Sequence, residues 1–175
     1  MRAFAIVRTA LERILAVVCI GLMFLLALLV IVAVFMRKFG MPFGWYDEVA
    51  AIMLAWITYY GAAFAALKRG HLGFPNLVAA MPKWPRLAFV LFSTALVLGF
   101  FGLVTWFGTQ VVILLQGDTL ISLPWVPISF SQSVVPIGAA LFVIAELLVL
   151  PDRIREALHE APPVDPERAI VEGAQ

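Results

Sequence analysis

Few side chains in this sequence could carry out chemistry, and they lie far apart. The two histidines, His71 and His159, have no cysteine or acidic residue at the spacing of metal ligands, so the sequence predicts no metal site. The single cysteine, Cys19, cannot form an internal disulfide or a Cys-x-x-Cys redox pair. No phosphate-binding loop, Gly-x-Ser-x-Gly or His-Glu-x-x-His motif occurs. The sequence therefore predicts neither an enzyme nor a cofactor-binding protein.

Two neighbouring acids, Asp47 and Glu48, are the first candidates for a functional role. They stand directly before an uncharged run of 19 residues, 49–67, and would occupy the start of a helix. The partial positive charge at such a helix start stabilises a carboxylate by about 0.3–1 kcal/mol. One interpretation is therefore a helix cap. The other is a contact with a partner, or an ion pair with Arg37, which ends the preceding apolar run. Trp45, two residues before Asp47, is expected to anchor this end at the membrane interface.

Glu146 is the one acid that lies within an apolar run. Ionisable residues at membrane depth are energetically unfavourable and often mark a transport pathway. Glu146 stands about one turn before Pro151. In the structural interpretation it pairs with Arg153 or a neighbouring helix, or reaches the headgroups. The alternative is that it handles a coupling ion, which would make the chain a self-contained, small homo-oligomeric transporter or exporter.

Four apolar runs predict the elements that position these residues. The 175 residues are 63% hydrophobic and 13% charged, whereas about 25% of a soluble domain is charged. A hydrocarbon core about 30 Å thick needs about 20 helical residues, whose backbone groups must be bonded internally. The sequence therefore predicts an all-α integral membrane protein of the lipid bilayer, with one domain at 1–150. Its four transmembrane helices are expected at about 14–36, 46–67, 86–117 and 128–150.

The third run and the C-terminal tail add two expectations. Residues 87–117 form a run of 31 residues without charge, too long for an upright span, so a marked tilt is expected. Residues 151–175 form a polar tail, which is expected to be disordered after residue 162 because it is charged and rich in proline.

The positive charges predict how the chain is oriented. Of the 12 Lys and Arg residues, ten lie in the N-terminus, the second loop and the tail, and two lie in the first loop. Lys and Arg collect on the cytoplasmic side, so both termini are expected to be cytoplasmic. The net charge is only +1 and the basic residues are scattered, which argues against nucleic-acid binding.

Small and aromatic residues in the second run predict close helix packing. Gly61 and Ala65 have the small-xxx-small spacing that lets two membrane helices approach each other. Trp56 lies about one turn before that pair. The pattern predicts packing but does not name the partner helix.

Residues 10 to 150 resemble the small membrane subunit of tripartite ATP-independent periplasmic (TRAP) transporters, the dicarboxylate-transporter Q type. Each motif is short, but their order and spacing within the four-helix frame are specific. The motifs are Arg37, Trp45-Tyr46-Asp47-Glu48, Trp56 with Gly61 and Ala65, Gly70-His71-Leu72, Ser122-Leu123-Pro124-Trp125 and Pro136-Ile137-Gly138. One departure is Pro75, which stands where the family often carries an acid after the histidine.

The resemblance implies a scaffold role in the inner membrane of a bacterium. In that family a large membrane subunit takes up an organic anion with sodium, and a periplasmic binding protein delivers the anion. The small subunit packs against the large one. Eight residues would then form structural or partner contacts: Arg37, Trp45, Asp47, Glu48, Trp56, Gly61, Ala65 and His71.

Overall fold

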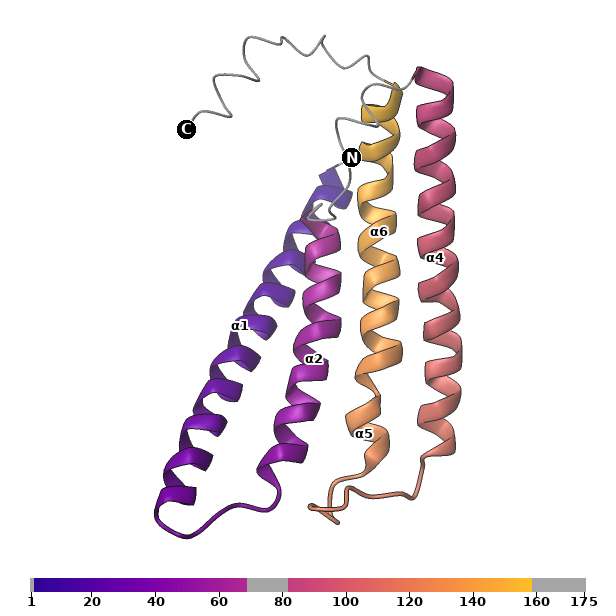
Figure 1. Ribbon diagram of the computed structural model, residues 1–175. Helices are drawn as coiled ribbons and strands as arrows, with labels where there is room; N and C mark the ends of the chain where they lie inside the picture. Colours follow the sequence, from indigo (N-terminus) through magenta and orange to yellow (C-terminus); the bar gives the residue numbers. More distant parts are fainter. Residues whose placement is uncertain (1, 69–81, 159–175) are drawn as a thin grey trace, which may run out of the picture.

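The computed structural model describes residues 2–68 and 82–158. Its helices are α1 (Arg2–Lys38), α2 (Tyr46–Leu67), α4 (Lys83–Leu114), α5 (Ile128–Gln132) and α6 (Val134–Leu158) (Figure 1). Together α5 and α6 form one span, and α1, α2 and α4 are the other three helices long and apolar enough to cross a membrane. The described residues contain no β-strand, only an isolated bridge between Thr119 and Pro127. The prediction of an all-α protein with four candidate transmembrane helices is thus confirmed.

Five of the helix bounds differ from those expected from the sequence. α1 begins at Arg2 rather than near residue 14, and α4 begins at Lys83 rather than near residue 86. α1 ends at Lys38 rather than near residue 36, and α4 ends at Leu114 rather than near residue 117. α6 continues through Pro151 to Leu158. The sequence-based bounds stop at the first charge or proline, but Arg, Lys and Glu are good helix formers. A proline inside a helix costs about 3 kcal/mol and can kink the helix without ending it. His71 and the tail after residue 158 lie outside the described residues.

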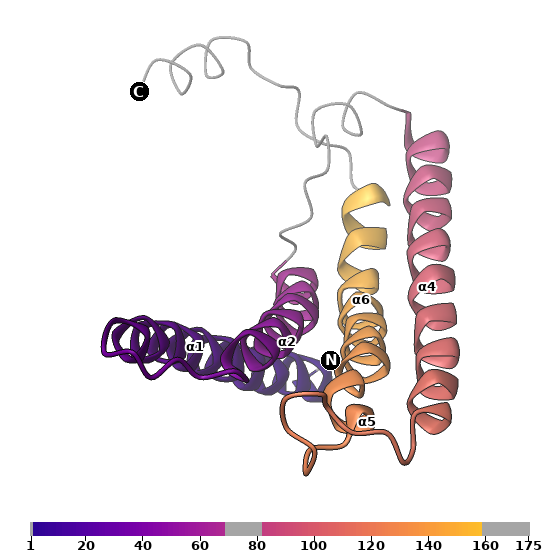
Figure 2. The same ribbon diagram turned by 60° about the horizontal axis from the view of Figure 1, so that its bottom comes forward.

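The helices stand in a row in the order α1, α2, α6, α4. α6 contacts both α2 and α4, whereas α1 contacts mainly α2, and two views turned by 60° show the same order (Figures 1 and 2). In the most apolar window of each span, 44% of the α5–α6 residues are buried, against 6–11% for the other three. α6 is therefore the central element of the described part of the chain.

Small residues explain how α6 fits between its two neighbours. A Cβ added to Gly138 would lie 2.6 Å from the Cβ of Tyr59 on α2, and one added to Gly108 on α4 would lie 3.3 Å from Pro136. Only a residue without a side chain permits the first of these approaches. On the α4 side, the rings of Phe101 and Phe142 stack with centroids 3.9 Å apart.

Candidate functional site

The polar contacts gather at the two ends of the row. We call the end with the α1–α2 and α4–α5 connections the loop end. The opposite end, where α1 and α4 begin and α2 and α6 finish, is the terminal end (Figure 1).

Glu48 joins the start of α2 to the connection between α4 and α5. Its carboxylate accepts the backbone N–H of Ser122 at 2.9 Å and that of Ile121 at 3.3 Å. Asp47, its neighbour, is exposed. Both acids lie in the first turn of α2, as expected, and Trp45 makes no side-chain cap there. Glu48 thus holds a distant part of its own chain, a contact that the sequence did not reveal.

Arg37 and Trp45 make local contacts where the end of α1 and the start of α2 are joined. The Arg37 guanidinium donates a hydrogen bond to the Tyr46 hydroxyl and lies 5.4 Å from the centre of that ring. Trp45 stacks on Phe43 with centroids 5.3 Å apart. No ion pair within residues 2–68 and 82–158 joins Arg37 to Asp47, so Arg37 serves to fasten the end of α1 to the start of α2.

Trp56 provides a second attachment between α2 and the loop end. Its Nε1–H donates a hydrogen bond to the Ser131 carbonyl at 3.2 Å, and its ring centroid lies 5.1 Å from that of Phe130. Both partners belong to the short helix α5. Glu48 and Trp56 therefore bind the segment that leads into α6 at two levels of α2.

The segment 115–127, which we call the α4–α5 hairpin, is closed by its own backbone bonds. Leu120 N–H donates to the Val126 carbonyl at 3.0 Å, and Ile128 N–H donates to the Asp118 carbonyl at 3.0 Å. Leu120 and Leu123 point into the protein and are buried. The side chains of Ile121 and Trp125 instead point away from it and are 92% and 77% exposed.

The Gly61 and Ala65 pair lies on an open part of α2. A Cβ added at Gly61 would meet no atom within 4 Å, and Ala65 is half-buried. The close approach of α2 to α6 occurs at Tyr59 and Gly138 instead. The packing role predicted for Gly61 therefore stays a prediction that concerns a partner outside this chain.

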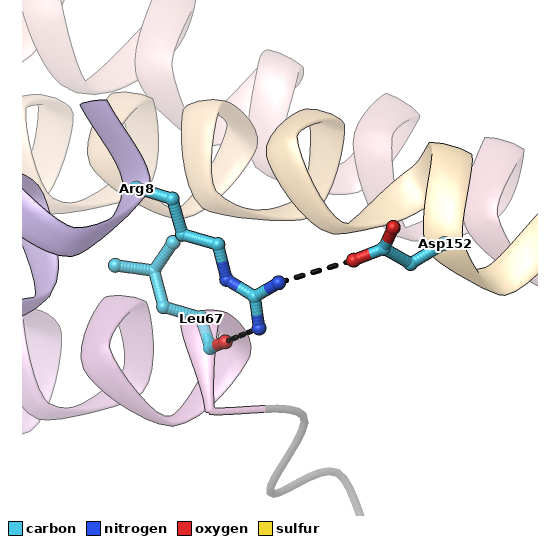
Figure 3. Close-up of polar contacts among 3 residues, drawn as sticks. All are labelled: Arg8, Leu67 and Asp152. Atoms are coloured by element: carbon cyan, nitrogen blue, oxygen red, sulfur yellow. Dashed lines mark hydrogen bonds and ion pairs between the residues drawn. The ribbon is translucent and has the colours of Figure 1, made fainter. Parts of the chain in front are cut away.

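At the terminal end, Arg8 links three helices (Figure 3). From α1, its Nη2 donates to the Leu67 carbonyl at 3.0 Å, and its Nη1 donates to Asp152 Oδ2 of α6 at 3.1 Å. Leu67 is the last residue of α2, where carbonyl groups lack partners within the helix. Arg8 thus caps α2 and holds it beside α6.

Two more basic residues act in the same way at this end. Arg86, which is buried at the start of α4, donates from Nε to the Ala157 carbonyl of α6 at 2.8 Å. Lys68, directly after α2, forms an ion pair with Glu12 of α1. The basic residues that predict membrane orientation therefore also fasten the ends of the helices.

Glu146 is 1% exposed and pairs with Arg153, two turns further along α6. This contact confirms the pairing that the structural interpretation predicts. The pair places a positive charge beside the one acid found within an apolar run.

Among the described residues, no group of three or more His, Cys, Asp or Glu side chains could hold a metal ion. A comparison with protein families finds a match over residues 26–156, to the family described as "Tripartite ATP-independent periplasmic transporters, DctQ component". A comparison with curated proteins finds no match. The matched range covers the chain from within α1 almost to the end of α6.

Proposed function

The chain belongs to the DctQ component family of tripartite ATP-independent periplasmic transporters, and on this premise we propose that it is the small scaffold subunit of such a transporter. It pairs with a large membrane subunit, which takes up an organic anion such as a C4-dicarboxylate together with sodium. A periplasmic binding protein delivers the anion to the complex. In this proposal the chain itself neither carries the anion nor catalyses a reaction.

One observation carries this proposal. Between the charged ends of the described spans, Glu146 is the single Asp, Glu, Lys or Arg, and Arg153 meets its charge. A protein that moves an anion with sodium needs polar groups at membrane depth to replace the water around both ions. A chain whose single charged residue between the span ends is already paired with an arginine suits a supporting role beside a subunit that binds the ions.

The eight residues singled out from the sequence fit structural or partner contacts in this proposal. Four of these residues stabilise the loop end through contacts within this chain: Arg37, Trp45, Glu48 and Trp56. We propose that Asp47, Gly61 and Ala65, which leave their part of α2 open, face the large subunit. His71 keeps a proposed partner role.

We place the loop end in the periplasm and both chain termini in the cytoplasm, in a bacterial inner membrane. Arg8, Lys68 and Arg86 at the terminal end support this orientation, because Lys and Arg concentrate on the cytoplasmic side. At the loop end, Arg37 and Lys38 are the only basic residues of the described chain.

Reconstitution tests the scaffold role directly. The tagged chain is purified with its large subunit, placed in liposomes under an inward sodium gradient and supplied with the binding protein and a labelled anion. Uptake is expected from the two membrane subunits together and from neither alone. Sodium-driven uptake by this chain alone would refute the proposal.

The burial of Glu146 keeps one alternative in view, that of a self-contained exporter. In the scaffold proposal, Glu146→Gln leaves uptake per assembled complex unchanged, because Glu146 contacts no substrate, although the loss of its pair with Arg153 lowers the stability of the chain. In the exporter alternative, the chain transports alone and Glu146→Gln abolishes that transport.

A further inference from the structure

The α4–α5 hairpin is held in one shape by bonds from two sources. Its own backbone bonds join Leu120 to Val126 and Asp118 to Ile128, and the Glu48 carboxylate holds two N–H groups at its tip. A carboxylate that accepts backbone N–H groups makes stronger hydrogen bonds than a neutral acceptor does. A segment fixed in advance loses little conformational entropy when a partner binds it.

The exposed side chains of this hairpin stand at a polar level of the molecule. Ile121 is bonded through its backbone to Glu48 in the first turn of α2, beside the exposed acid Asp47. Two carboxylates at that level place it among headgroups or water rather than in hydrocarbon. Lipid tails therefore do not cover Ile121, which is 92% exposed, although they would cover an equally exposed residue within a span.

The chemistry of the hairpin favours a protein partner over a lipid headgroup. Residues 115–127 contain no Lys or Arg, and their one charge is that of Asp118, so nothing attracts an anionic lipid. Tryptophan is among the residues that most often anchor a protein interface, and Ile121 adds an exposed apolar side chain beside Trp125 on the same hairpin. Permanent interfaces are more apolar than those of transient complexes, which favours a resident membrane partner over a binding protein that docks and leaves.

We propose that the α4–α5 hairpin is a preformed docking surface for the periplasmic edge of the large membrane subunit, with Ile121 and Trp125 as its anchors. This inference rests on the proposed function. Glu48 is the positioning residue of the surface, because it orients the hairpin through backbone bonds at its tip. The Glu48 carboxylate acts by holding the hairpin in shape, and it need not contact the large subunit.

Three exposed tryptophans provide a matched set for the test. Trp125 lies on the hairpin, Trp106 within α4 and Trp84 at the terminal end, and they are 77%, 66% and 80% exposed. Because none is buried, each can be changed to alanine without opening a cavity. Trp125→Ala is expected to weaken the affinity for the large subunit at least about tenfold, while Trp84→Ala and Trp106→Ala change it less than about threefold.

Photo-crosslinking identifies what covers the hairpin. A benzoylphenylalanine residue replaces Trp125 or, as the control, Trp84 in the full chain, which is expressed with its large subunit and binding protein and irradiated in cells. An adduct between position 125 and the large subunit, absent from position 84, is expected. An adduct with the binding protein alone, or no protein adduct at position 125, overturns the inference.

The two proposals fail in different ways. If the wild-type chain recovers no large subunit, the proposed function is wrong. If the wild-type complex forms but Trp125→Ala binds as tightly as Trp84→Ala does, only the docking surface is wrong. Glu48→Gln is expected to weaken binding, and Glu48→Asp to restore little of it, because the shorter side chain does not reach both N–H groups.

Discussion

Gly138→Ala should destabilise the isolated chain, whereas Gly61→Ala should not. The added Cβ at position 138 would lie 2.6 Å from the Tyr59 Cβ, about 1 Å inside the optimal separation of two carbons. The nearest atom is attached directly to the α2 backbone, so relief requires α2 and α6 to move apart. Overfilling a packed interface in this way costs about 1–3 kcal/mol.

Comparing Gly138→Ala with Gly61→Ala cancels the gain in helix propensity that both substitutions bring. An alanine in a helix is favoured over glycine by about 1 kcal/mol, and both positions are helical, so both variants gain it equally. The free energies of unfolding, measured in bicelles by steric trapping, should therefore differ by about 1–3 kcal/mol, with Gly138→Ala the less stable. Equal values would refute the close packing of α2 on α6. Tyr59→Ala should restore little, because its Cβ remains.

Three further changes test the contacts at the helix ends, each by the same unfolding measurement. Arg8→Ala should cost about 1–3 kcal/mol, because the last carbonyl of α2 loses a charged donor, while Asp152→Asn, which leaves that bond in place, should cost less than about 1 kcal/mol; equal costs would contradict a cap. Glu146→Leu should destabilise the chain by leaving Arg153 without its carboxylate, and adding Arg153→Leu should recover most of the loss; a purely additive double variant would contradict the pair. Trp56→Phe, which keeps the ring contact, should cost about 0.5–1.5 kcal/mol for the hydrogen bond to α5, and no change would mean that this bond adds nothing.

The membrane makes much of this fold predictable from sequence. Hydrocarbon permits only helices and closed barrels, and long runs that are apolar on every face, without alternation, fit helices. α2 was expected at 46–67, and the structure has it at Tyr46–Leu67. The helix ends were harder, because whether α1 continues to Arg2 depends on contacts such as that of Arg8 with α2 and α6. Such contacts join residues far apart in the chain and leave no periodic pattern.

The candidate site shows the same limit more sharply. Glu48 was singled out, but its partner Ser122 lies 74 residues further on, and backbone N–H groups have no signature in a sequence. Small-xxx-small spacing drew attention to Gly61, whereas the close contact is made by Gly138. The spacing in the sequence shows which face of a helix carries small side chains. Only the three-dimensional arrangement shows whether another helix packs against that face.

A row of helices in lipid changes what exposure means. α1 and α4 carry many exposed apolar side chains, yet lipid tails solvate these side chains as well as protein does, so this exposure does not locate a partner. Exposure is informative where lipid gives no cover, and the described chain has such a place at Ile121, beside the carboxylates of α2. Exposure is also informative where small side chains leave one face of a helix open and no other described helix packs against it, as at Gly61. Both places belong to α2 or to the segment that α2 holds, so we expect α2 to be the helix around which the two membrane subunits assemble.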